Sequence, residues 1–213
     1  MLECLTRLQM EAWNGYVFSR EPLNARFDDE QRARWLRQSV SCGRQYAEGI
    51  KRKYGTGDPL TLAEEMGLNV SYPQRPENAD RVLFAEYKYP DNIYIYMDVV
   101  HRAEVYLRES EIREILSDQL DVKRLLLAHE LFHYLEEKDS GRIFTKQETV
   151  CLWRFGPIHN DSSIHVLGEI AAMAFARELT GISYSPYVMD VFLVYCYSPE
   201  EASRLFKEIM DKV

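Results

Sequence analysis

The chain reads LLAHELFH at residues 126–133, an H-E-x-x-H pattern inside an apolar segment. Two histidines four positions apart, here His129 and His133, lie one above the other on a single helical face. Their ring nitrogens can therefore converge on one metal ion, and zinc favours such ligands. Glu130 follows the first histidine, where a carboxylate can act as a general base. The stretch predicts a helix that carries part of a metal site.

The helix itself is predicted independently of the histidines. Apolar residues recur at three- and four-residue spacings along this segment: Val122, Leu125, Leu126, Leu131, Phe132 and Leu135. Asp121 is a suitable N-cap and Ser140-Gly141 ends the pattern, so we expect a helix over 122–138. The alternative is a helix with two surface histidines and no metal, because short motifs also occur by chance.

Composition limits the class of protein. A chain of 213 residues that is 46% hydrophobic and 28% charged is typical of a soluble globular protein of one domain, with room for an appendage. The net charge of −8 argues against direct binding to nucleic-acid phosphates. Apolar runs of membrane-spanning length and signal-peptide features are both absent from the sequence, so we expect a cytoplasmic protein without a membrane partner. The four scattered cysteines are expected to be free thiols.

The remaining patterns predict an α+β fold, in which a small antiparallel sheet packs with several helices. Residues 1–55 are expected to form a helical N-terminal extension, whose main helix is capped at Asp28 or Asp29 and ends near Gly55. Residues 56–213 are expected to form the second unit. Strand-like runs cover 68–72, 81–87 and 92–97, and the last two predict a hairpin.

Helix signals dominate the second half of the chain. A loop is expected between the motif helix and about residue 162, followed by a helix that Ser162 or Ser163 caps and Gly181 closes. Ser185-Pro186 and Ser198-Pro199 are expected to open the last two helices.

A catalytic zinc site needs a third protein ligand. Nine residues downstream of the motif are candidates: Glu136, Glu137, Asp139, Glu148, His159, Asp161, His165, Glu169 and Glu178. Glu169 is favoured because its helical segment is otherwise apolar, and an unpaired carboxylate is costly to bury there. A solvent-facing Glu169 on an amphipathic helix is the equally supported alternative. His165 lies four residues earlier on the same face and is a candidate for a role beside the site.

Three segments over residues 56–210 resemble the ImmA/IrrE family of zincin-like metallopeptidases. LAHELFH at 127–133 is similar to the family's A-H-E-L-G-H core, and EIAAMAFAREL at 169–179 to its E-x-x-A-N-x-F-A-x-E-L segment. Residues 190–205 are similar to its C-terminal helical pair. The resemblance implies a zincin-like fold with a gluzincin-like ligand set, in which His129, His133 and Glu169 bind Zn²⁺ and Glu130 is the catalytic base.

The resemblance also implies a function. It indicates a zinc-dependent metalloendopeptidase that performs regulatory proteolysis in the cytoplasm, with a co-encoded helix-turn-helix repressor as the substrate. In such a mechanism one further donor stabilises the oxyanion, and His165 and Tyr184 are the candidates for that donor.

The chain departs from the family pattern at several positions. Phe132 stands at the family's glycine, Met173 at its asparagine, and Thr180-Gly181-Ile182 replaces its L-M-P. A large side chain at 132 is expected to narrow the space near the helix or to fill a larger core, and Met173 removes a polar partner for the metal ligands. These changes motivate a second hypothesis, a metal-stabilised regulatory or binding protein with little or no peptidase activity.

Overall fold

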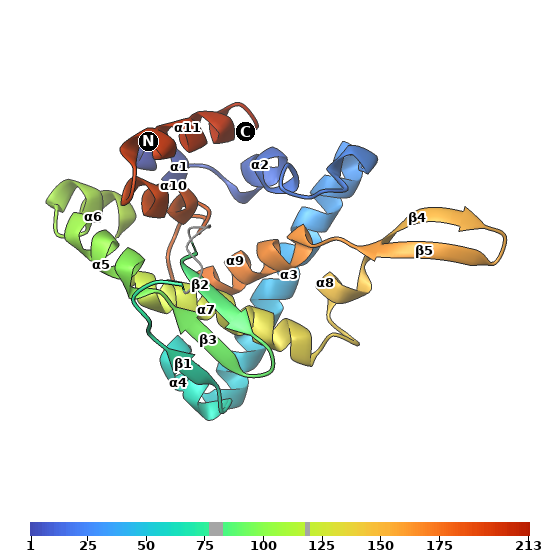
Figure 1. Ribbon diagram of the computed structural model, residues 1–213, viewed down its shortest axis with the longest axis horizontal. Helices are drawn as coiled ribbons and strands as arrows, with labels where there is room; N and C mark the ends of the chain where they lie inside the picture. The colour runs from blue at the N-terminus through green and yellow to red at the C-terminus, as the bar shows by residue number, and fades with distance from the viewer. Residues whose placement is uncertain (77–82, 118–119) are drawn as a thin grey trace.

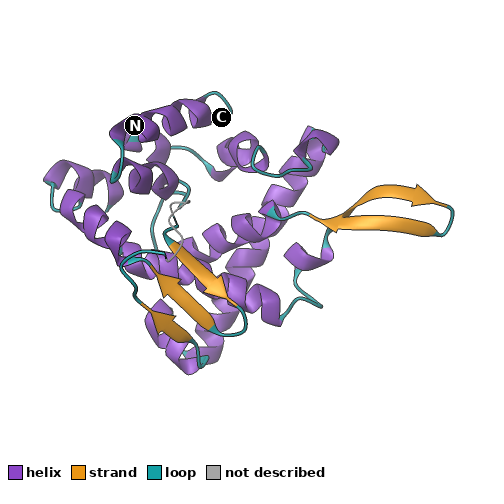
Figure 2. Cartoon of the chain, in the orientation of Figure 1, coloured by secondary structure: helices purple, strands orange, loops and turns teal. Residues whose placement is uncertain are grey.

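The computed structural model describes residues 1–76, 83–117 and 120–213, and over these residues the fold is mixed α+β with a predominance of helix (Figures 1 and 2). The N-terminal elements are α1 (Leu2–Thr6), the 3-10 turns η1 (Met10–Trp13) and η2 (Asn24–Arg26), α2 (Asn14–Phe18) and α3 (Asp29–Tyr54). The other helices are α4 (Pro59–Glu65), α5 (Met97–Tyr106), α6 (Ser110–Leu116), α7 (Val122–Lys138), α8 (Phe144–Gln147), α9 (Val166–Thr180), α10 (Val188–Tyr195) and α11 (Pro199–Met210). None of the described helices combines the length and apolar character that crossing a lipid bilayer requires.

A three-stranded sheet lies against α7. It contains β1 (Asn69–Ser71), β2 (Ala85–Lys88) and β3 (Asn92–Ile95) in the order β1-β3-β2. The predicted hairpin is confirmed as the antiparallel pair β2–β3, whereas β1 runs parallel to β3, so the sheet is mixed and not wholly antiparallel. Two residues of the predicted strand run, Arg81 and Val82, lie outside the described residues.

The residues predicted to cap the long helices α3, α7 and α9 include Asp28, Asp121 and Gly181, and these three do so. Asp28 accepts a hydrogen bond from the Gln31 backbone amide as part of a capping box at the start of α3, and Asp121 accepts one from the Arg124 amide at the start of α7. Gly181 closes α9 in the left-handed conformation, with φ +75°. However, α9 begins at Val166, later than predicted, because the preceding strand extends to Ser163.

Helices α3, α7 and α9 form the centre of the molecule, and α9 packs against both of the others. The approach of α3 to α9 needs a glycine, since a Cβ atom at Gly43 would lie 2.1 Å from the Ala171 carbonyl oxygen. Buried side chains of the first 55 residues, including Trp13 and Trp35, belong to the same hydrophobic cluster as Leu131 and Phe175. The N-terminal segment is therefore helical and shares its core with the rest of the chain.

The packing of Phe132 explains why a large residue follows Leu131 in the motif. Its side chain is fully buried, and its ring centroid lies 6.0 Å from that of Tyr46 on α3 and 5.6 Å from that of Phe175 on α9. Phe132 thus fills the core where the three helices meet, which is the second of the two outcomes expected from the sequence.

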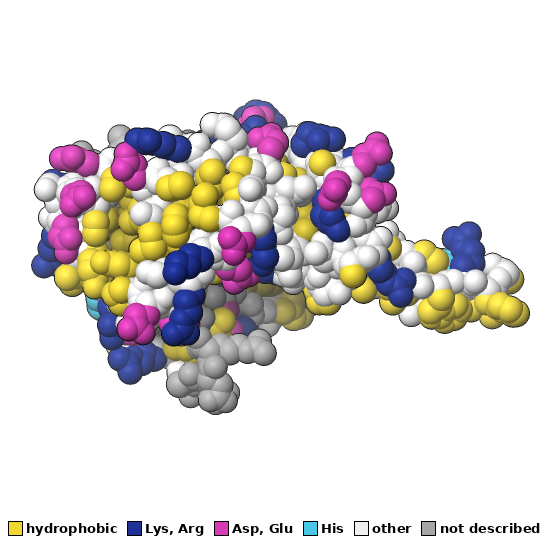
Figure 3. Space-filling view, turned by 90° about the horizontal axis from the view of Figure 1, so that it is seen from above, with side chains coloured by type: hydrophobic (Ala, Val, Ile, Leu, Met, Phe, Trp, Pro, Cys, Tyr) yellow, Lys and Arg dark blue, Asp and Glu magenta, His cyan; other side chains and the backbone are white. Residues whose placement is uncertain are grey.

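The prediction of a loop between α7 and about residue 162 is wrong for most of that segment, which contains α8 and two strands. Residues 149–163 form the antiparallel strands β4 (Thr149–Phe155) and β5 (Ile158–Ser163), and this hairpin extends away from the body (Figure 1). Gly156, with φ +61°, makes the turn. Trp153 and Phe155 alternate along β4, Ile158 pairs with Phe155, and all three apolar side chains stay exposed (Figure 3). Because the strands lack a buried face, the sequence shows no core-facing pattern there.

Candidate metal centre

The two-helix arrangement brings together the three residues expected to bind a metal. His129 and His133 lie one turn apart on α7, and Glu169 lies in the first turn of α9. The Nε2 atoms of the two histidines are 3.1 Å apart. Glu169 places Oε2 at 3.3 Å from Nε2 of His129 and Oε1 at 3.5 Å from Nε2 of His133. Each ring nitrogen therefore faces a different oxygen of the carboxylate, and one ligand atom from each residue lies within 4.8 Å of the other two. We call these three side chains the donor triangle.

This triangle fits a tetrahedrally coordinated ion. Ligands that bind zinc at about 2.0–2.1 Å with tetrahedral angles lie roughly 3.3–3.4 Å from one another. The observed distances of 3.1, 3.3 and 3.5 Å are close to this spacing, with each histidine measured to its own oxygen of Glu169. Two imidazoles and one carboxylate are also a ligand set of catalytic zinc sites, which keep a fourth position open. The same donors suit other divalent transition metals, so the arrangement fits a metal ion without selecting zinc.

The Glu169 carboxyl group is ionised at neutral pH. Partial burial raises its pKa, but the hydrogen bond and charge of His129 and the charge of His133 outweigh that effect and hold the pKa at about 2. The side chain remains 53% exposed to solvent, on the side that faces the pocket described below. Glu169 thus offers a charged ligand atom that a metal ion can reach.

A second carboxylate supports His133 from behind. Glu136 is buried, and its Oε2 lies 3.6 Å from Nδ1 of His133, the ring nitrogen that faces away from the donor triangle. Such a carboxylate orients a metal-binding histidine and raises its basicity. Gly168 on α9 leaves the space for Glu136, because a Cβ atom there would lie 2.6 Å from Oε1. Sequence analysis considered Glu136 as a ligand; the structure places it behind one.

The electrostatics of the cluster attract positive charge. Burial lowers the pKa of His133, but the hydrogen bond to Glu136 and the charges of Glu169 and Glu130 raise it to about 9. A proton and a metal cation compete for the same imidazole, so the field that retains the proton also favours a cation.

Glu130 lies beside the triangle and is nearly inaccessible to solvent. Burial raises the pKa of its carboxyl group, while His129, His133 and a hydrogen bond from the Tyr87 backbone amide oppose the rise. The carboxylate is thereby fixed by β2 on one side and lines the pocket on the other. A carboxyl group with a raised pKa is suited to accept and release a proton.

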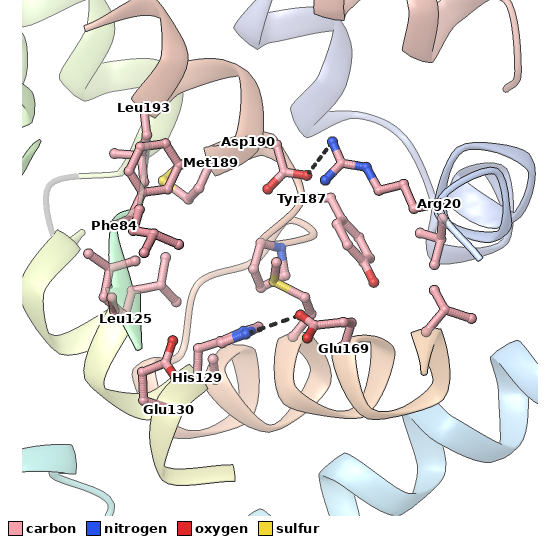
Figure 4. Close-up of a pocket in the computed structure, with 18 of the residues that line it drawn as sticks. Arg20, Phe84, Leu125, His129, Glu130, Glu169, Tyr187, Met189, Asp190 and Leu193 are labelled. Atoms are coloured by element: carbon pink, nitrogen blue, oxygen red, sulfur yellow. Dashed lines mark ion pairs between the residues drawn. The ribbon is translucent and has the colours of Figure 1, made fainter. Parts of the chain in front are cut away.

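A pocket of about 450 Å³ is lined by two residues of the donor triangle, His129 and Glu169, and by Glu130. Most of its wall is apolar, with side chains from α7, α9, α10, β2 and the residue before β2: Leu125, Leu126, Met173, Ala176, Met189, Leu193, Ala85 and Phe84. Polar groups gather at two places in Figure 4. His129, Glu130 and Glu169 lie at one of them, and Arg20 and Asp190 lie at the other.

Of the two residues expected to stabilise the oxyanion, His165 and Tyr184, only His165 lies at the pocket. His165 lines the pocket, next to the first turn of α9. Tyr184 does not line it, and its hydroxyl group donates a buried hydrogen bond of 2.9 Å to the Leu116 carbonyl oxygen. The expectation for Tyr184 is therefore wrong, because its donor is already used elsewhere in the core. Tyr187 lines the pocket instead, and its buried hydroxyl group has no hydrogen-bond partner among the described residues.

The other candidate ligands contact different groups. These contacts are Glu137 with Lys146, Asp139 with Tyr46, Glu148 with Trp35, Glu178 with Lys51, and His159 with Asp161 on the hairpin. Sequence reasoning missed Arg20, Tyr187 and Asp190, which line the pocket. No local pattern marks them, since each reaches the site only through the packing of distant segments.

Comparisons with protein-family models, with curated proteins and with solved structures found no match to this chain. The functional argument therefore depends on the residues of the site and on their arrangement.

Proposed function

We propose that this chain is a zincin-like, zinc-dependent metalloendopeptidase. The observation that carries the proposal is the donor triangle of His129, His133 and Glu169, with edges of 3.1–3.5 Å, beside the buried carboxylate of Glu130. The pocket that adjoins these groups provides room for part of a substrate. The resemblance of the motif segments to the ImmA/IrrE family supports the same conclusion.

Each residue has a defined task in peptide hydrolysis. His129, His133 and Glu169 would hold zinc, which supplies a water of pKa about 7 and polarises the scissile carbonyl group. Glu130 accepts a proton from the attacking water and passes it to the leaving amine. Glu136 keeps the His133 ring in position through Nδ1. His165 is our candidate for the donor that stabilises the oxyanion.

The edge strand β2 supports binding of an extended peptide. Phe84 accepts a hydrogen bond from Tyr96, so the antiparallel register turns the backbone groups of Phe84, Glu86 and Lys88 toward β3. The backbone groups of Ala85 and Tyr87 consequently face the free edge, where the Tyr87 amide already binds Glu130. Ala85 lines the pocket, and its backbone groups have no hydrogen bond at this edge among the described residues, so they can pair with a substrate strand.

The family resemblance suggests the biological setting. It supports regulatory proteolysis of a co-encoded, repressor-type protein in the cytoplasm. The net charge of −8 favours a protein substrate over direct contact with nucleic acid.

One observation favours the alternative of a metal-binding protein without useful peptidase activity. Met173 lines the pocket where the family has asparagine, so the wall near the ligands loses a polar side chain. This alternative predicts bound metal without hydrolysis.

A cleavage experiment separates the two functions. The zinc-loaded protein is incubated with a proteome-derived peptide library, and new termini are identified by mass spectrometry. We expect cleavage by the native chain and by Glu137→Gln, a control on the exposed side of the same helix. Glu130→Gln should bind zinc normally and lose at least about a hundredfold in rate, as a general base contributes about 10²–10⁴. Cleavage at an undiminished rate by Glu130→Gln would contradict the mechanism, and zinc binding without any cleavage would favour the alternative.

A further inference from the structure

Arg20 brings a positive charge to the metal pocket from the N-terminal segment, which lies outside the region of family resemblance. It follows α2 in the chain and lines the pocket together with Val17. In Figure 4 its guanidinium group lies near Asp190, on the opposite side of the drawn cluster from Glu130. Among the described residues that line the pocket, Arg20 is the only lysine or arginine.

The guanidinium group is held in a fixed orientation. It stacks over the Tyr16 ring at 4.6 Å from the ring centroid, and its Nη2 donates to the Tyr16 hydroxyl group. The same Nη2 lies 3.6 Å from Oδ2 of Asp190, which accepts a hydrogen bond of 2.8 Å from Tyr16. All of these contacts use one face of the group and one of its nitrogens.

The rest of the guanidinium group is free to bind a ligand. Nη1 and Nε have no hydrogen-bond acceptor among the described residues, and the side chain is 54% exposed. A pre-oriented guanidinium group with unused donors is matched by a carboxylate, which it can bind through two parallel hydrogen bonds.

The charge distribution of the pocket makes Arg20 decisive for acidic substrates. Glu130, Glu169 and Asp190 all line the pocket and would repel a substrate carboxylate. Arg20 opposes them as the one lysine or arginine among the described residues that line the pocket. The apolar side chains of Leu125, Met189 and Leu193 complete the wall of the pocket and suit an aliphatic residue of the same peptide.

We propose that Arg20 is a specificity-determining residue that binds a carboxylate of the peptide substrate. The carboxylate belongs either to an acidic side chain or to the chain end, and the two share the same chemistry. The inference rests on the proposed peptidase function, and it assigns the choice of substrate to the N-terminal segment.

The test measures binding, so it does not depend on turnover. Three peptides with the same N-terminal succinyl hydroxamate, which occupies the open position of a zinc site, are titrated into zinc-loaded protein by calorimetry. They end in Leu-Gln-amide, in Leu-Glu-amide, and in Leu-Gln with a free α-carboxylate. The variants are Arg20→Gln, Arg20→Lys and the control Arg7→Gln, because Arg7 is exposed and also pairs with a carboxylate, that of Glu3.

We expect one of the two charged ligands to bind the native chain about 10–100-fold more tightly than the neutral ligand. That preference should disappear in Arg20→Gln, weaken in Arg20→Lys and persist in Arg7→Gln, while the neutral ligand binds all four proteins alike. The ligand that gains identifies the source of the carboxylate.

Four results would overturn the inference. Equal binding of charged and neutral ligands by the native chain would contradict the role of Arg20 and leave the peptidase proposal intact. A preference for a charged ligand that survives in Arg20→Gln would do the same. Equal loss of all three ligands in Arg20→Gln would show a purely structural role. Failure of the neutral hydroxamate to bind the zinc-loaded native chain would contradict the peptidase proposal, and the inference with it.

Discussion

At the scale of single residues, the environment of each charged group determines what it can do. Glu130, Glu136 and Glu169 are three carboxylates within one cluster, yet each has a different partner: the Tyr87 amide, Nδ1 of His133, and Nε2 of His129. The local motif was sufficient to predict His129, Glu130 and His133, because one helical turn fixes their spacing. Glu136 was recognised only as a possible ligand, since its role depends on the ring orientation of His133.

Glu136→Gln is predicted to weaken zinc binding about 10–100-fold, the usual effect of removing the partner of a metal-binding histidine. The affinity is measured by competition with a chromogenic chelator. Glu137→Gln, a change on the neighbouring exposed position, should leave the affinity unchanged. Equal affinities for the native chain and Glu136→Gln would show that Glu136 does not support His133.

Phe132→Ala is predicted to reduce the free energy of unfolding by about 3–5 kcal/mol, because it leaves a cavity between α3, α7 and α9. Urea unfolding measures the change. Phe155→Ala removes the same side chain at a position that is 82% exposed, and it should alter stability by less than about 0.5 kcal/mol. Similar losses from both substitutions would contradict the assignment of Phe132 to the core.

At the scale of elements, several helix ends could be predicted from the sequence, but the starts of α9 and α10, at Val166 and Val188, lie three or more residues after the predicted ones, and helix neighbours could not be predicted. Asp28, Asp121 and Gly181 act as the end signals that their residue types indicate, because a cap needs only nearby backbone groups. Glu169 could be favoured from its apolar surroundings and from the family resemblance, but only the packing of α9 on α7 places it against the histidines. The strands β4 and β5 were missed because neither has a buried face that imposes an alternating pattern.

Two glycines of α3 give opposite predictions. Gly43→Ala should destabilise the chain by about 1–3 kcal/mol, since its Cβ atom would meet the Ala171 carbonyl oxygen of α9. Gly49→Ala meets no atom within 4 Å and should stabilise the chain by up to about 1 kcal/mol through helix propensity. Urea unfolding compares the two; a stabilising Gly43→Ala would contradict the close packing of α3 on α9.

At the scale of the whole molecule, distant segments build one pocket. The N-terminal segment supplies Arg20, α7 and α9 supply the ligands, and α10 supplies Asp190. These long-range combinations are the part of the site that sequence patterns did not reveal. The β4–β5 hairpin, in contrast, packs mainly on itself. Its described contacts with the body include Val150, which packs against the core, and a hydrogen bond of 3.0 Å from Arg26 to the Leu152 carbonyl oxygen.

The hairpin is therefore predicted to be dispensable for the metal centre. Replacing residues 151–161 with Asn-Gly joins the paired residues Val150 and Ser162 through a two-residue turn. The shortened chain should keep the zinc affinity of the native chain and a single cooperative thermal transition. Calorimetry measures both, and a loss of zinc binding would show that the hairpin supports the site.

The central claim is that α7 and α9 together hold one metal ion, and a zinc titration tests it most directly. Calorimetric titration of the metal-free protein compares the native chain, Glu169→Gln and the control Glu178→Gln, which lies on the same helix and contacts Lys51. We predict one zinc ion per native chain, a loss of affinity of at least about tenfold in Glu169→Gln, and native affinity in Glu178→Gln. Native affinity in Glu169→Gln, or no zinc binding by the native chain, would contradict the two-helix metal centre.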